Sequence, residues 1–129
     1  MQWPPITIGS SPMFKALLKN KPLTRDAHAL YSAVVAKSRS PEFYQTIGVP
    51  DSFDGRFEMM ILHLYLVHEW LQRDAASGKK ISQAVFDLFL SDMDRSLREA
   101  AVGDVTVPKR LSKMTKVYYG RSKAYDAAN

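Results

Sequence analysis

The feature that most constrains this chain is one long, nearly continuous apolar segment. Of the 15 residues from Phe57 to Leu71, only Glu58, His63, His68 and Glu69 are not apolar. A helix with apolar side chains on almost every side must be covered by neighbouring elements over most of its surface. The longest apolar run inside it is broken by His63 and falls far short of the ~20 residues that cross a bilayer. We therefore expect a central, buried helix.

Helical spacing of apolar residues continues on both sides of this segment, and the sequence shows no internal repeat and no useful strand-like alternation. The pattern predicts an all-α fold: a single compact bundle of about five helices. The expected helices are one capped by Thr24, one from Ser40-Pro41 that stops at Gly48, one over about 55–76 capped by Gly78, one over about 82–101 that stops at Gly103, and one from near Pro108.

The two ends of the chain carry their own expectations. Residues 1–12 are typical of a flexible arm or a vector-derived remnant, and Met13 is a natural start, so the expected domain spans 13–129. The first residues lack the cationic start and apolar run of a secretory signal, which favours a cytoplasmic location. The last helix has no stop signal before Asn129, which indicates a shortened C-terminus.

Charge is distributed unevenly along the chain. The net charge of +5 divides into +4 over 13–25, −3 over 26–103 and +4 over 104–129. Basic ends around an acidic middle are typical of contact with a polyanion such as ribosomal RNA or anionic lipid, although a solvated surface explains the pattern equally well. The absence of cysteine excludes a disulfide scaffold, thiolate metal sites and a cysteine nucleophile.

The last predicted helix is strongly amphipathic, provided that it continues through Gly120. Four lysines fall within an arc of about 80°, and apolar side chains fill the opposite arc. Such a basic stripe can follow a phosphate backbone or lie against anionic headgroups, and it can also be a plain solvated face. The lysines are Lys109, Lys113, Lys116 and Lys123, and the apolar residues are Leu111, Met114, Tyr118 and Tyr125.

Three groups in the middle of the chain are candidates for chemistry. His63 lies on the apolar side of the central helix, where it is either a satisfied core histidine or a functional ligand or latch. In the segment Asp92–Glu99, carboxylates and arginines at helical spacing predict the ion pairs Asp92–Arg95, Asp94–Arg98 and Arg95–Glu99. Arg56 lies on the same side as His63, and we expect it either to cap its helix or to pair with Asp94 or Glu99.

The sequence argues against an enzyme. It contains no G-x-S-x-G motif, no phosphate-binding glycine loop and no dinucleotide fingerprint. Asp92 and Asp94 could ligate Mg²⁺, but residues two apart on a helix point away from each other and the arginines compete for both carboxylates. His28, His63 and His68 lack zinc-ligand spacing. We expect neither catalysis, nor a cofactor, nor a metal site.

Two stretches together carry a family resemblance. The first comprises Phe43-Tyr44, the run Ile47–Met59 and Leu62-His63; the second comprises Asp92–Glu99, Val102–Asp104, Val107–Lys109 and Tyr119–Arg121. In motif order and spacing over residues 27–126 the chain resembles the ubiquinol–cytochrome c chaperone family. The resemblance implies an all-helical domain that binds newly made cytochrome b during assembly of the ubiquinol–cytochrome c reductase complex, and that works with a small partner protein near the ribosome.

The residues and the resemblance together yield a primary hypothesis and two alternatives. The primary one is a bacterial, non-catalytic assembly chaperone of the cytoplasm or the inner face of the inner membrane, which binds nascent cytochrome b or another subunit of that complex. Its client-facing residues are expected to be Arg56, His63, Asp94, Arg98 and Glu99. The alternatives are a ribosome- or RNA-associated protein that uses the basic stripe, and a helical enzyme that uses Asp92 and Asp94 with Mg²⁺. DNA binding is not expected.

Overall fold

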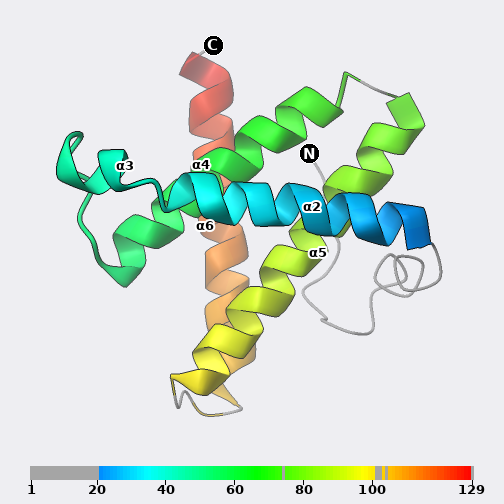
Figure 1. The fold of residues 1–129 in the computed structure, drawn as a ribbon. Coiled ribbons are helices and arrows are strands. Elements are labelled where there is room, and N and C mark those ends of the chain that lie inside the picture. Colours follow the sequence, from blue (N-terminus) through cyan, green and yellow to red (C-terminus); the bar gives the residue numbers. More distant parts are fainter. Residues whose placement is uncertain (1–20, 74, 101–102, 104, 129) are drawn as a thin grey trace.

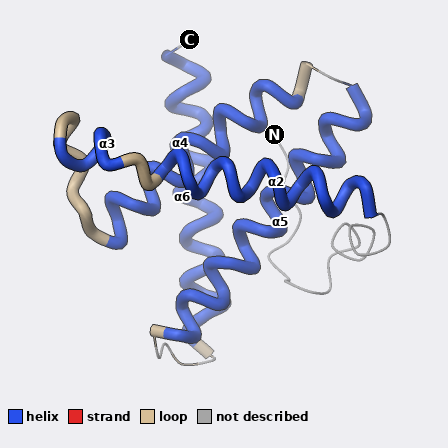
Figure 2. The backbone as a smooth tube through the Cα atoms, in the orientation of Figure 1, coloured by secondary structure: helices blue, strands red, loops and turns tan. Residues whose placement is uncertain are grey.

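The computed structural model describes residues 21–73, 75–100, 103 and 105–128 (Figure 1). Within them the chain is helical, with no strand (Figure 2). The helices are α2 (Lys21–Ser38), α3 (Pro41–Gln45), α4 (Phe53–Leu71), α5 (Ala75–Glu99) and α6 (Thr106–Ala128). The all-α prediction is confirmed. Among the described residues, four of these are long helices and α3 is a short segment of 5 residues, so the expected count of about five is corrected to four. The expected arm, 1–12, lies outside the described residues.

Three layers of helices build the molecule. In Figure 1, α2 crosses in front of α4 and α5, and α6 passes behind them, so that α4 and α5 form the middle layer. This position explains the composition of α4, whose Ile61, Leu64 and Leu71 are almost completely buried. A helix that is contacted from both sides needs apolar residues over most of its circumference. The predicted central helix is thus confirmed.

The core has two connected parts. The larger part joins α2, α4, α5 and α6, and includes Ala27, Ile61, Phe86, Phe89 and Tyr118. The smaller part joins the end of α5 to the beginning of α6, through Leu97, Val107, Leu111 and Met114. Phe57 and Met93 pack against both parts. The first half of α4, which contains Phe57, therefore packs against both parts of the core, and the exposed surface beside Phe57 is held in place by them.

Several helix ends differ from the sequence prediction. Thr24 lies inside α2 instead of capping it, and Gly78 lies inside α5 instead of ending α4. Helix α4 ends earlier, at Leu71, where Gln72 keeps a right-handed helical conformation and donates its backbone N–H to His68. No glycine is needed for such an exit. Helix α5 can begin at Ala75, since alanine is the best helix former and offsets the cost of one internal glycine.

The link between α3 and α4 contains the sharpest backbone constraints of the described chain. Gly48 has a φ of 88°, a left-handed conformation that glycine adopts without strain. At Gly55, an added Cβ would lie 1.9 Å from the carbonyl oxygen of Pro50. The 46–52 link therefore lies directly on the first turn of α4. In the described residues, no helix is long and apolar enough to cross a membrane.

Candidate functional site

A groove opens where the end of α2, the first half of α4 and the second half of α5 meet. Its volume is about 290 Å³. We call it the α2/α4/α5 groove. Its bed is apolar, and polar side chains lie among its lining, which suits an apolar side chain with polar neighbours. The apolar lining consists of Val35, Phe53, Phe57, Met60, Met93 and Leu97, and the charged lining of Arg39, Arg56 and Asp92.

Two phenylalanines separate this groove from a second hollow. Phe53 stacks on Phe57 with ring centroids 6.4 Å apart, and Phe57 stacks on the buried Phe89 at 6.0 Å. Phe53 itself is 55% exposed, although it is the first residue of a largely buried helix. On its other side lies a hollow of about 350 Å³ that α6 lines with Lys113 and Arg121. The exposed ring is thus accessible from both hollows.

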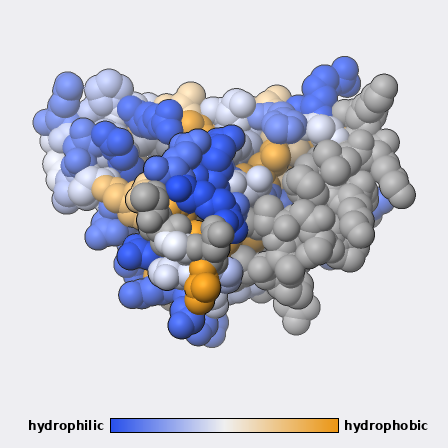
Figure 3. Space-filling view, turned by 90° about the horizontal axis from the view of Figure 1, so that it is seen from below, coloured by the Kyte–Doolittle hydropathy of each residue, from blue (hydrophilic) through white to orange (hydrophobic). Residues whose placement is uncertain are grey.

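The apolar surface near the groove is divided by charge. Seen from below, the described surface shows hydrophobic patches among hydrophilic side chains, with no broad apolar face (Figure 3). Asp92, which lines the groove, accepts the hydroxyl of Tyr31 on one carboxylate oxygen and a bond from Arg95 on the other. Burial, with the neighbouring carboxylate, raises the pKa of Tyr31 far above its usual value. The phenol therefore stays a donor and holds Asp92 in place.

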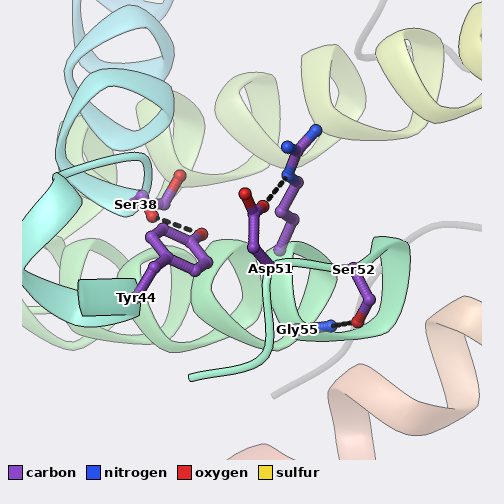
Figure 4. Close-up of polar contacts among 6 residues, drawn as sticks. Ser38, Tyr44, Asp51, Ser52 and Gly55 are labelled. Carbon is purple, nitrogen blue, oxygen red and sulfur yellow. Dashed lines mark hydrogen bonds and ion pairs between the residues drawn. The ribbon is translucent and has the colours of Figure 1, made fainter. Parts of the chain in front are cut away.

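Arg56 lies at the groove, but its predicted partners were wrong. It binds Asp51 at 2.7 Å (Nε to Oδ1) instead of Asp94 or Glu99 (Figure 4). The reason is the close approach at Gly55, which brings the preceding link over the start of α4. Ser52 caps the same turn, and its Oγ accepts the N–H of Gly55 at 3.2 Å (Figure 4).

The charged segment of α5 forms two of its predicted ion pairs. Arg95 binds Asp92, and Arg98 binds Asp94 at 3.0 Å between Nε and Oδ2. Arg98 and Glu99 are exposed near the end of α5, and together with Asp94 they lie outside the groove lining. The structure therefore brings only Arg56, of the five predicted client-facing residues, to the groove.

Of the two histidines of α4, the one that the sequence placed on the apolar side is not the buried one. His63 is only partly buried; its Nδ1 lies 2.7 Å from the carbonyl oxygen of Met59, and its ring meets Phe43 edge-on. The buried histidine is His68, whose Nδ1 lies 2.5 Å from Ser82 Oγ. Burial lowers the pKa of His68. The spacing within α4 does not indicate this burial, because it depends on α5, which supplies Ser82.

Helix α6 has the geometry that the sequence predicts. It runs without interruption through Gly120, and its four predicted lysines, Lys109, Lys113, Lys116 and Lys123, are exposed. Leu111, Met114 and Tyr118 are buried on the opposite side. One contact was not predicted: Arg121 binds Glu58 of α4, with Nη2 at 2.7 Å from Oε1. The two residues are 63 positions apart in the sequence, so the spacing of residues within one helix cannot predict this bond.

Metal chemistry has no support in the described part of the chain. It contains no group of three or more histidine, aspartate or glutamate side chains that could hold a metal ion. Asp92 is occupied by Tyr31 and Arg95, and Asp94 by Arg98. Both carboxylates of the suggested Mg²⁺ site therefore already have structural partners.

An all-helical domain with an apolar groove, an exposed aromatic ring and charged neighbours is typical of a protein-binding domain. Comparison with known proteins identifies which one. The model of the ubiquinol-cytochrome C chaperone family matches residues 45–129, and the chain belongs to this family. The match covers Phe53 and all of α4, α5 and α6.

Individual relatives agree with this assignment. The chain is 23% identical over 97 residues to ubiquinol-cytochrome c reductase complex assembly factor 1 of Mus musculus, and 24% identical over 97 residues to that of Homo sapiens. These matches cover 75% of this chain, but only 33% and 32% of the relatives, so the chain spans about a third of their length.

A solved structure is also similar. The crystal structure of the Cbp3 homolog from Brucella abortus superposes with a TM-score of 0.75 at 37% sequence identity. The similarity covers 85% of this chain and 61% of that one. It confirms the helical fold over most of the described residues.

Proposed function

We propose that this protein is a non-catalytic chaperone for assembly of the ubiquinol–cytochrome c reductase complex, and that its client is newly made cytochrome b. Family membership and the names of the mouse and human relatives support the assembly role. The observation that carries the proposal for this chain is the exposed Phe53 ring at the α2/α4/α5 groove, within the family match. A client segment with exposed apolar side chains is what such a groove accepts.

In this proposal the groove holds a client through reversible, non-covalent contacts. An apolar client side chain would contact Phe53, Phe57 and Met60, and the flexible methionine adapts to different shapes. Arg56 would meet polar groups at its edge. Asp94, Arg98 and Glu99, on the neighbouring end of α5, extend this surface in the proposal, and His63 belongs to a separate part of α4. Only reversible contacts are involved, as release to the assembling complex requires.

Site-specific photocrosslinking in the native host tests the client proposal. A photoreactive amino acid at position 53 is expected to capture cytochrome b during its synthesis. The same probe at Ala124, an exposed residue of α6, serves as the matched control. Cytochrome b adducts that form equally from both positions, or from neither, would contradict a client site at the groove.

The alternative function, association with the ribosome or RNA, has one specific observation in its favour. The lysine face of α6 is exposed along its length, as a phosphate-binding surface requires. This function predicts ribosome binding that weakens steeply with salt and is lost when Lys109, Lys113 and Lys116 are changed to glutamate. Together with peripheral contact at the inner face of the inner membrane, it is compatible with the chaperone role.

A further inference from the structure

The outward face of α4, opposite Ile61 and Leu64, is covered along only part of its length. Over its first half, α3 and the following link lie on it: Gly55 is beneath Pro50, Met59 is buried, and His63 meets Phe43. Over its second half, the face continues with two large apolar residues that remain exposed. Leu66 is 52% exposed and Trp70 is 63% exposed, one turn apart.

Cations follow this exposed pair directly. Arg73 is exposed and lies one turn after Trp70, to whose carbonyl its backbone N–H donates at 3.3 Å. The end of α4 and the beginning of α5 lie near each other (Figure 1), and the first part of α5 carries Lys79 and Lys80, both exposed. Over residues 72–80 the sequence has these three bases against one acid, Asp74.

We propose that this corner of the fold contacts the surface of an anionic lipid bilayer. We call it the α4–α5 corner, formed by Leu66, Trp70, Arg73, Lys79 and Lys80. Tryptophan favours the boundary between hydrocarbon and headgroups, because its ring is apolar and its N–H is polar. Neighbouring lysine and arginine side chains attract anionic headgroups.

The size of the exposed pair favours a bilayer over a protein partner. A stable protein interface buries roughly 800 Å² on each side around a well-packed apolar centre. Two isolated side chains followed by cations do not supply such a centre, whereas peripheral lipid contact needs only shallow insertion plus charge. The bilayer is thus the occupant that the chemistry of the corner matches.

The corner is independent of the client groove. Phe53 begins α4 and Leu71 ends it, so the exposed ring of Phe53 and the last residue of α4 are about 27 Å apart along the helix axis at 1.5 Å per residue. A client could occupy the groove while the other end of α4 rests on lipid. The inference rests on the peripheral membrane contact of the proposed function, for which it names the surface, and its failure would leave the client site at the groove untouched.

Trp70 is itself the reporter for the test. The full chain with Trp3→Phe has one tryptophan, whose emission is recorded with phosphatidylcholine vesicles that contain or lack phosphatidylglycerol. We expect a blue shift with the anionic vesicles only, weakened by salt. The triple change Arg73→Glu, Lys79→Glu and Lys80→Glu is expected to lower vesicle affinity at least tenfold, and Leu66→Ser to lower it less.

A matched variant carries the same change of charge on α6: Lys109→Glu, Lys113→Glu and Lys116→Glu. It should keep most of the vesicle affinity and the blue shift, while circular dichroism shows that all variants remain folded. Unchanged Trp70 emission with anionic vesicles would overturn the proposal. So would equal binding to both vesicle types, or a loss of binding in the α6 variant as large as in the corner variant.

Discussion

Asp87 is the residue whose surroundings conflict most with its charge. It is 6% exposed on α5, and within the described structure its Oδ2 has no hydrogen-bond partner. Gln83 reaches Oδ1 only at 3.4 Å. Burial raises the pKa of Asp87 to about 6, from an ordinary value of 3.8. At neutral pH the folded protein therefore holds an ionised carboxylate in a poorly solvated place, which costs stability.

Replacing this carboxylate by a neutral amide should stabilise the protein in a pH-dependent way. Because the pKa of Asp87 is raised in the folded state, its ionised form lowers the stability of the protein above about pH 6. This loss of stability disappears as the pH falls towards 4. Asp87→Asn should therefore raise the free energy of unfolding by about 1–2 kcal/mol at pH 7.5 and have little effect near pH 4. Urea unfolding at both pH values measures this; an equal effect at both would contradict the assignment.

Gly55 allows the 46–52 link to lie on α4. Gly55→Ala should lower the free energy of unfolding by about 1–3 kcal/mol, because its Cβ would collide with the rigid backbone oxygen of Pro50 at 1.9 Å. Relief requires the link to move, which should also disturb the Asp51–Arg56 ion pair at the groove. Chemical denaturation measures the change. Wild-type stability in the variant would show that the link does not approach α4 so closely.

The same substitution in the middle of α6 should have the opposite sign. Gly120 is exposed in a helix interior, and an added Cβ would meet nothing within 4 Å. Gly120→Ala should therefore stabilise the protein by up to about 1 kcal/mol through helix propensity. It also serves as the control for Gly55→Ala. A destabilised Gly120→Ala protein would indicate that α6 is not continuous there.

The elements show what the sequence could predict and where it failed. Apolar spacing predicted α2, α4, α5 and α6, because helices of 18 residues or more bury several turns of one face. It misplaced helix ends at Thr24 and Gly78, since one residue's capping preference is weaker than tertiary packing. The ion pairs within α5 were predictable from local spacing. Those between distant elements, such as Arg121–Glu58, were not.

The candidate site was predicted less well than the fold for the same reason. The sequence indicates the motif around Arg56. The ion-pair partner of Arg56 depends on the close approach of Pro50 to Gly55, which spacing along a helix does not encode. In the sequence, Phe53 stands out only as part of that motif. Its exposure at a groove follows from the meeting of three helices that lie far apart in the sequence.

Over the whole molecule, separate surfaces serve separate contacts. The groove lies next to the beginning of α4, the α4–α5 corner at its end, and the lysine face along α6. The core packs beneath all three surfaces, so exposed side chains of one can be changed without loss of the others. Substitutions on exposed side chains can therefore separate client binding from folding.

Phe53→Asp should separate client binding from folding most clearly. The change removes one stacking contact, so the free energy of unfolding should fall by no more than about 1 kcal/mol. Client affinity should fall roughly tenfold or more if the ring anchors the client. The control is Ile47→Asp, which also replaces an exposed apolar side chain by aspartate; Ile47 is 63% exposed and lies outside the groove lining. Equal complementation of a deletion strain by both variants would argue against the groove.

The central claim is that this protein assists assembly of the ubiquinol–cytochrome c reductase complex. Deleting its gene in the native host, and recording the b-type haem spectrum and ubiquinol–cytochrome c reductase activity of the membranes, tests that claim most directly. The account predicts that both are lost selectively and return with the wild-type gene. Membranes with unchanged b-type haem and unchanged reductase activity would contradict it.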